Sequence, residues 1–126
     1  MKKILLADDF DVDMMLIRIA VESFHSQYTV KLAYDGEEAY RLLKTIHFDL
    51  LLLDIKMPLL DGFELMERLH ADGAGLIPTI IVSGFGIAEH RARALALGAD
   101  DFIHKAVDYN VFKADLRSAL GRHGLL

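Results

Sequence analysis

The sequence contains no cysteine, and this absence excludes a disulfide framework and any metal site built on thiolates. It also lacks an apolar run of the roughly 18 residues that a membrane-spanning helix needs, so we expect no membrane insertion. The opening MKKILLADD begins like a signal peptide, but its apolar stretch ends in two aspartates after four residues. That stretch is too short for a signal peptide, so we predict a cytoplasmic protein.

Clustered basic charge is absent as well. The 14 Lys and Arg residues are scattered and outnumbered by 19 Asp and Glu, which gives a net charge of −5. Nucleic-acid-binding surfaces are basic, so we predict no direct contact with nucleic acid. The six histidines, at positions 25, 47, 70, 90, 104 and 123, include no pair at ligand spacing on an expected helix face. We interpret them as surface residues rather than as a metal site.

The length of 126 residues is typical of one domain, and 53% hydrophobic residues are enough to build a core. No linker, low-complexity segment or repeat of fixed period interrupts the chain. We therefore predict that residues 1–126 form a single domain, and we expect either a monomer or a weak dimer.

Short apolar runs alternate with segments of helical period. The apolar runs predict strands at 3–7, 28–33, 50–53, 77–82 and 101–104. Helices are predicted at 12–24, after a cap at Asp35, and at 60–71, 87–97 and 108–122. The first helix is indicated by apolar residues at 12, 15, 16 and 19, and the second by those at 39, 42, 43 and 46. This alternation predicts an α/β fold, a doubly wound (βα)5 unit around a parallel five-stranded sheet.

Polar residues follow the predicted strands at the ends where ligands bind in open parallel sheets. Asp8 and Asp9 follow the first strand, Asp54 the third, Ser83 the fourth and Lys105 the fifth. Each alone has a simpler explanation, because aspartates cap helices, serines form turns and lysines are usually solvated. Their convergence on one edge of one sheet predicts a functional site.

Electrostatics constrain what such a site can do. Two like charges about 4 Å apart repel by roughly 4 kcal/mol at an effective dielectric near 20. Lys105 supplies one countercharge, and we expect a hard divalent cation to supply the rest. Oxygen ligands select Mg²⁺, with Mn²⁺ as a second possibility, and Mg²⁺ favours phosphate oxygens as further ligands. The site is therefore suited to a phosphoryl group, with Asp54 as the nucleophile.

The motifs ADD, LLLLDIKMPLLDG, IIVSG and LGADDFIHK stand in an order and spacing that resemble the receiver domain of two-component response regulators, the CheY-like fold. The resemblance covers essentially the whole chain and implies the strand order 2-1-3-4-5. It implies that Asp54 accepts a phosphoryl group from a sensor histidine kinase or a histidine phosphotransfer protein. It also implies that Asp9 binds Mg²⁺ directly, that Asp8 acts through water, and that the backbone carbonyl of Lys56 is a further ligand.

The same resemblance implies how the signal leaves the site. Ser83 and Lys105 would bind the phosphoryl oxygens, and Phe102 would rotate inward behind the hydroxyl, although an aromatic on a short strand is also a common core residue. The face formed by the helix at 87–97, the strand at 101–104 and the helix at 108–122 would bind a downstream protein. The protein would then be a phosphorylation switch rather than an enzyme, with at most self-phosphorylation from small donors and self-dephosphorylation.

The sequence departs from the family at three positions. Ala106 replaces the usual proline, and a cis bond before another residue costs roughly 2.5–4 kcal/mol against about 0.5–1 before proline. We expect a trans bond, which leaves open the course of the following loop and the position of Lys105. Lys56 is either a solvated lysine or an ammonium that reaches the mouth of the site. Leu59 replaces a common glycine and makes its turn stiffer and more apolar.

Other functions fit the sequence less well. A receiver-like interaction module that is independent of phosphorylation is the main alternative; the missing proline supports it and the intact acids oppose it. A haloacid-dehalogenase-like phosphatase needs a D-x-D motif on an early strand, but Asp54 is followed by Ile55 and Lys56. Nucleotide or flavin binding needs a glycine-rich loop where this chain has ADDFDVD. Whether the domain is autonomous or cut from a longer protein stays open.

Overall fold

Five strands alternate with five helices in the computed structural model, which describes residues 2–73, 75–84 and 88–125. The strands are β1 (Lys2–Ala7), β2 (Tyr28–Ala33), β3 (Leu50–Leu53), β4 (Thr79–Ser83) and β5 (Asp101–His104). The helices are α1 (Asp11–Phe24), α2 (Gly36–Thr45), α3 (Gly62–Ala71), α4 (Ala88–Ala96) and α5 (Tyr109–Arg122). The sheet order is β2-β1-β3-β4-β5, and all neighbours are parallel, which confirms the predicted fold.

The predicted bounds of β2, β3 and β5 agree with the structure, whereas β4 is shifted. It begins at Thr79 rather than at residue 77, because Pro78 has no N–H to give to the ladder. It also includes Ser83, which the sequence had placed after the strand. The predicted start of the fourth helix at residue 87 lies outside the described residues, and α4 is described from Ala88.

Helix α3 begins two residues later than predicted because Asp61 caps it. The Asp61 carboxylate accepts a hydrogen bond from the Glu64 backbone N–H at 2.8 Å, and the Glu64 carboxylate accepts one from the Asp61 N–H at 3.1 Å. This reciprocal capping box satisfies two backbone donors that a helix start otherwise leaves unpaired. The residues before Asp61 therefore stay in the loop that follows β3.

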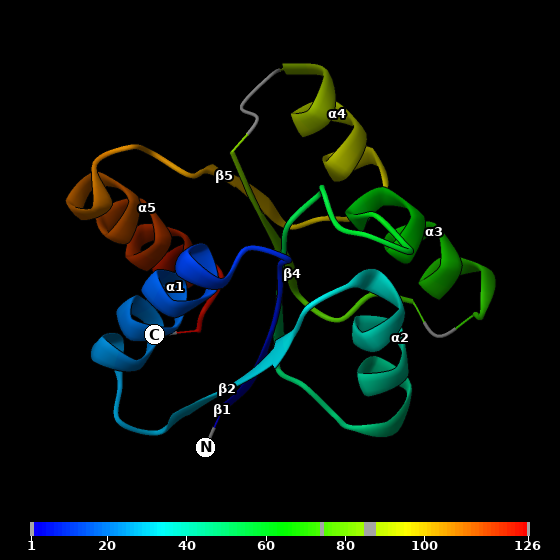
Figure 1. The fold of residues 1–126 in the computed structure, drawn as a ribbon, viewed down its shortest axis with the longest axis horizontal. Coiled ribbons are helices and arrows are strands. Elements are labelled where there is room, and N and C mark those ends of the chain that lie inside the picture. Colours follow the sequence, from blue (N-terminus) through cyan, green and yellow to red (C-terminus); the bar gives the residue numbers. More distant parts are fainter. Residues whose placement is uncertain (1, 74, 85–87, 126) are drawn as a thin grey trace.

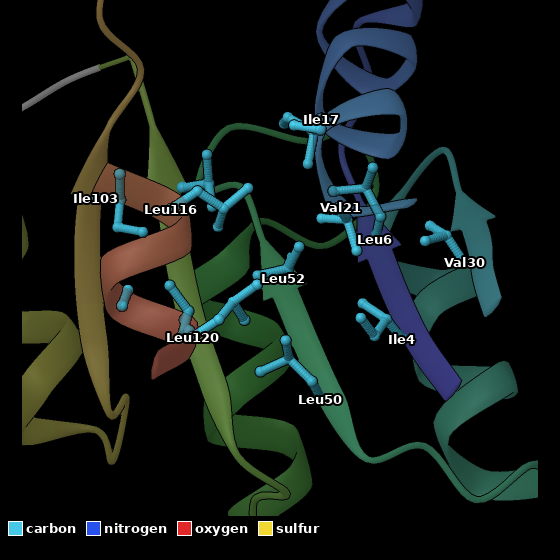
Figure 2. Packing of buried hydrophobic residues seen from close by; sticks show 14 of the residues in the cluster. Ile4, Leu6, Ile17, Val21, Val30, Leu50, Leu52, Ile103, Leu116 and Leu120 are labelled. Atoms are coloured by element: carbon cyan, nitrogen blue, oxygen red, sulfur yellow. The ribbon is translucent and has the colours of Figure 1, made fainter. Parts of the chain in front are cut away.

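Two hydrophobic layers enclose the sheet. Figure 1 shows α1 and α5 on one side and α2, α3 and α4 on the other. Alternate residues of β3 face the two layers. Leu50 and Leu52 pack towards α1 and α5, and Leu51 and Leu53 pack towards α2, α3 and α4. Figure 2 shows the first layer, where Leu50 and Leu52 lie among side chains from β1, β5, α1 and α5. Burial on both faces explains why the strands read as continuous apolar runs.

Helix α1 carries a second apolar face that the sequence did not distinguish from its buried one. The residues that predicted the helix, Val12, Met15, Leu16 and Ile19, are its exposed stripe. Its buried face is formed by Met14, Ile17, Ala20 and Val21. An apolar period therefore located the helix correctly but did not identify the side that faces the sheet. No helix in the described part of the chain is long and apolar enough to cross a membrane.

The turn after Pro58 holds Leu59 in the left-handed region, with φ of 71° and a side chain exposed to 75%. This conformation costs a residue with a Cβ roughly 1–2 kcal/mol, and glycine adopts it without that cost. Part of the gain is offset because glycine has more conformational freedom in the unfolded chain. We expect Leu59→Gly to raise the free energy of unfolding by about 0.5–1 kcal/mol, measured by guanidinium denaturation.

The matched control is Leu95→Gly, which also removes a half-exposed leucine but lies within α4. There glycine should lower the free energy of unfolding by up to about 1 kcal/mol, because it disfavours the helical backbone that Leu95 adopts in the last turn of α4. A loss of stability in both variants would show that the turn at Leu59 is not strained.

Candidate functional site

The register of the sheet brings the ends of β1 and β3 together. Ala7 is paired with Leu53, and the Asp54 N–H donates a hydrogen bond to the Ala7 carbonyl at 2.9 Å. Asp8 and Asp54 therefore lie side by side where the strand order reverses, since β1 has β2 on one side and β3 on the other. This is the position at which open parallel sheets bind ligands.

The carboxylates predicted to converge do so. Asp8, Asp9 and Asp54 each offer a carboxylate oxygen within 4.8 Å of the others. Asp8 and Asp54 are buried, whereas Asp9 is exposed at the mouth of the site. Asp8 also accepts a hydrogen bond from the Phe10 N–H at 3.0 Å, which holds its carboxylate in the loop between β1 and α1. Three oxygen donors in this arrangement fit a hard divalent cation.

A glycine permits the close packing behind Asp54. The Gly62 N–H donates to the Ile55 carbonyl at 2.7 Å, and a Cβ at Gly62 would lie only 2.5 Å from the Asp54 carbonyl oxygen. The Asp54 carboxylate in turn accepts a hydrogen bond from the Ile55 N–H at 2.8 Å. The start of α3 therefore sets the backbone that carries Asp54.

Lys105 reaches the site although Ala106 stands where the family usually has proline. Its Nζ lies 2.6 Å from an Asp8 oxygen and 3.4 Å from an Asp54 oxygen. The expected trans bond is confirmed, because the described residues contain no cis peptide. The Lys105 N–H donates to the Ser83 carbonyl at 2.7 Å, so the end of β4 holds the lysine backbone in place.

Sequence reasoning missed a fourth acid. Asp13, in the first turn of α1, lies 2.9 Å from the Lys105 Nζ. No pattern in the sequence marked it, and 92 residues separate it from the lysine that it contacts. The contact depends on how α1 is rotated against the sheet, which the two apolar faces of that helix left undetermined.

The surroundings of Asp54 make its negative charge unfavourable. Burial raises the pKa of Asp54 to about 6; Lys105 and the Ile55 N–H lower it, and the charge of neighbouring Asp8 raises it further. Burial alone would lower the pKa of Lys105, but hydrogen bonds to Asp8 and Asp13 and the charge of Asp54 hold it well above its usual value. The lysine is therefore permanently charged, whereas the Asp54 carboxylate is costly to ionise.

The remaining predicted residues surround this centre. Ser83 is fully buried at the end of β4, and Phe102 is buried in the layer formed with α2, α3 and α4. The burial of Phe102 fits both a core residue and a switch residue, so its switching role stays a prediction. Lys56 is exposed and lines a surface pocket together with Asp9, which places it beside the mouth of the site.

Comparisons with known proteins agree with this geometry. The family model of the response regulator receiver domain matches residues 4–117. The response regulator GtcR of Aneurinibacillus migulanus is 39% identical over 104 residues, which are 82% of this chain and 41% of that protein. The probable transcriptional regulatory protein SilR of Salmonella typhimurium is 31% identical over 122 residues, which are 97% of this chain and 52% of that protein. The chain thus spans about half the length of the curated relatives that it matches.

A solved structure gives the same result. The phosphorylated cyanobacterial phytochrome response regulator RcpA is 25% identical, with a TM-score of 0.82 over 94% of this chain and 91% of that one. Because the family match covers most of the chain and the predicted acids meet at its sheet edge, the chain belongs to the response regulator receiver domains of two-component signal transduction.

Proposed function

We propose that Asp54 is the phosphoacceptor of a switch driven by a histidine kinase or a histidine phosphotransfer protein. The supporting observation is the meeting of a buried Asp54, two further aspartates and the Lys105 ammonium at one sheet edge. An Asp54 oxygen attacks the phosphorus of a phosphohistidine, a new O–P bond forms and the P–N bond breaks. The imidazole nitrogen leaves with the bonding electrons and takes a proton from water.

The residues of the chain have separate roles in this transfer. The Lys105 ammonium and the Ser83 hydroxyl bind phosphoryl oxygens and stabilise their charge. Asp9, Asp54 and the Lys56 backbone carbonyl would hold Mg²⁺ or Mn²⁺ directly, and Asp8 would act through water. When bound, the cation would neutralise charge on the carboxylates and on the phosphoryl group. Asp8 suits an indirect role because Lys105 and the Phe10 N–H already engage both of its oxygens.

The signal would pass from β4 to β5, the edge strand of the sheet. Ser83 and Phe102 lie on these neighbouring strands, and Ile81 is paired with Phe102. A shift of the Ser83 hydroxyl towards the phosphoryl group would change the packing of Phe102 and of the face formed by α4, β5 and α5. We propose that this face binds a downstream protein. A single domain over residues 1–126, a cytoplasmic location and the absence of direct nucleic-acid contact belong to the same proposal.

Incubation with acetyl phosphate and Mg²⁺ tests the phosphoacceptor directly. We expect intact-mass spectrometry to show the addition of one phosphoryl group, which is lost on acid treatment. Asp54→Asn should show no addition, because its amide is not a nucleophile for phosphorus. Asp11→Asn removes an exposed carboxylate from α1 and should be labelled like the wild type. A wild-type chain that gains no phosphoryl group would instead favour an interaction module that is independent of phosphorylation.

A further inference from the structure

The Lys105 ammonium contacts three carboxylates. Asp13, which is not part of the cluster of Asp8, Asp9 and Asp54, lies closer to it than Asp54 does. The Nζ lies 2.6 Å from Asp8, 2.9 Å from Asp13 and 3.4 Å from Asp54. The first two distances are those of strong charge-assisted hydrogen bonds, and the third is longer than a good one. Asp13 therefore competes with Asp54 for the ammonium.

The three acceptors differ in their access to water. The side chain of Asp8 is 1% exposed and that of Asp54 is 10% exposed, whereas that of Asp13 is 32% exposed. An ammonium has three donors, and here each faces one carboxylate. Asp13 is thus the partner that the lysine can release at least cost, because water can replace the lysine at the Asp13 carboxylate.

We propose that Asp13 is a positioning residue that holds Lys105 against α1 and keeps its ammonium from closing on Asp54. This inference rests on the proposed function, because it assigns Asp13 to the same phosphoacceptor site. In the resting protein Asp13 holds one donor of the lysine at 2.9 Å, so the contact with Asp54 stays long at 3.4 Å and the Asp54 carboxylate remains accessible to a cation. When a phosphoryl group arrives, one of its oxygens takes the place of Asp13.

The loop after β5 is part of the same arrangement. Asp13, Lys105, Ala106 and Val107 line one pocket between α1 and the start of α5. The ion pair thus joins this loop to α1. Its release would make the α1 side of the site sensitive to phosphorylation, in addition to the proposed α4, β5 and α5 face.

Binding of Mg²⁺ measured by isothermal titration calorimetry tests the proposal. In Asp13→Asn the Lys105 ammonium should move closer to Asp8 and Asp54, where it competes with the cation. We expect the Kd for Mg²⁺ to rise by about tenfold, the lower end of the loss that follows removal of an outer partner of a metal site. Asp11→Asn removes the same charge from the same helix turn, and it should change the Kd by no more than about twofold because salt screens exposed charges. Asp13→Glu, which keeps the carboxylate, should restore part of the affinity.

A double-mutant cycle shows whether Asp13 acts through the lysine. In a Lys105→Met background, which has no ammonium to position, Asp13→Asn should affect the Kd no more than Asp11→Asn does. Equal effects of Asp13→Asn and Asp11→Asn in the wild-type background would overturn the proposal. The proposal would also be overturned if, in the Lys105→Met background, Asp13→Asn still raised the Kd for Mg²⁺ more than Asp11→Asn does. Labelling of the wild type by acetyl phosphate is judged separately, so failure of the phosphoacceptor function and failure of the Asp13 role are distinguishable.

Discussion

Replacing Gly36 with alanine is expected to lower the free energy of unfolding by about 3 kcal/mol, at the upper end of the cost of overpacking. A Cβ at this position would lie 2.0 Å from the Leu60 carbonyl oxygen and 2.4 Å from the Leu60 Cβ. The obstacle is backbone, so no side-chain rotation relieves it. The Gly36 N–H also donates to the Pro58 carbonyl at 3.4 Å, so moving α2 away weakens a second contact with the same loop.

Gly121→Ala is the matched control for this prediction, measured by guanidinium denaturation in the same way. Gly121 lies near the end of α5, and a Cβ there would meet nothing within 4 Å. Alanine is the better helix former, so this variant should be more stable than the wild type by about 0.5–1 kcal/mol. If Gly36→Ala were as stable as the wild type, the start of α2 and the loop after β3 would not be in close contact.

The contact at Gly36 illustrates what the sequence does and does not determine. Strands were predictable because both faces of the sheet are covered and each strand is apolar throughout, as in Leu50–Leu53. Loop geometry was not, because it depends on tertiary approach. Leu59 in the left-handed region, the late start of α3 and the Leu60 carbonyl over Gly36 all belong to one loop, and none follows from local residue preference.

The site was predictable to the extent that it follows from topology. Residues after β1 and β3 must be neighbours once the strand order is known. The proximity of Asp8 and Asp54 could therefore be predicted from the sequence. Asp13 could not, because its position depends on the rotation of α1 about its axis. That helix has apolar residues on two faces, and the period in the sequence described the exposed one.

The second large effect concerns the charge of Asp54. In the cation-free protein, Asp54→Asn should raise the free energy of unfolding at pH 7 by about 1–3 kcal/mol, because it removes a buried carboxylate that repels Asp8. The upper bound follows from a pKa of about 6 in the folded chain against an ordinary value of 3.8. The asparagine still fills the site, and Lys105 keeps Asp8 and Asp13 as partners.

The sign of the pH dependence follows from proton linkage. Between about pH 4 and pH 6 the folded chain keeps the Asp54 proton that the unfolded chain has lost, so the stability contributed by this group falls as pH rises. Below about pH 4 both states are protonated, and the wild type and Asp54→Asn should be nearly equal in stability. Their difference should then grow through pH 5 and reach its full value above about pH 6.5, since acids remote from the site titrate alike in both proteins and cancel.

Guanidinium unfolding of both proteins in EDTA at pH 4, 5, 6 and 7 measures this difference. Asp11→Asn, which removes an equal charge from the exposed start of α1, should give a small difference that hardly changes with pH, because exposed charges contribute little to stability. A difference between wild type and Asp54→Asn that is constant from pH 4 to pH 7 would mean that the variant acts through packing. A less stable Asp54→Asn at pH 7 would mean that Lys105 already compensates the carboxylate in full. In that case Asp8, Asp9 and Asp54 could lie together without a cation to offset their charges, and the electrostatic argument for a cation site would no longer hold.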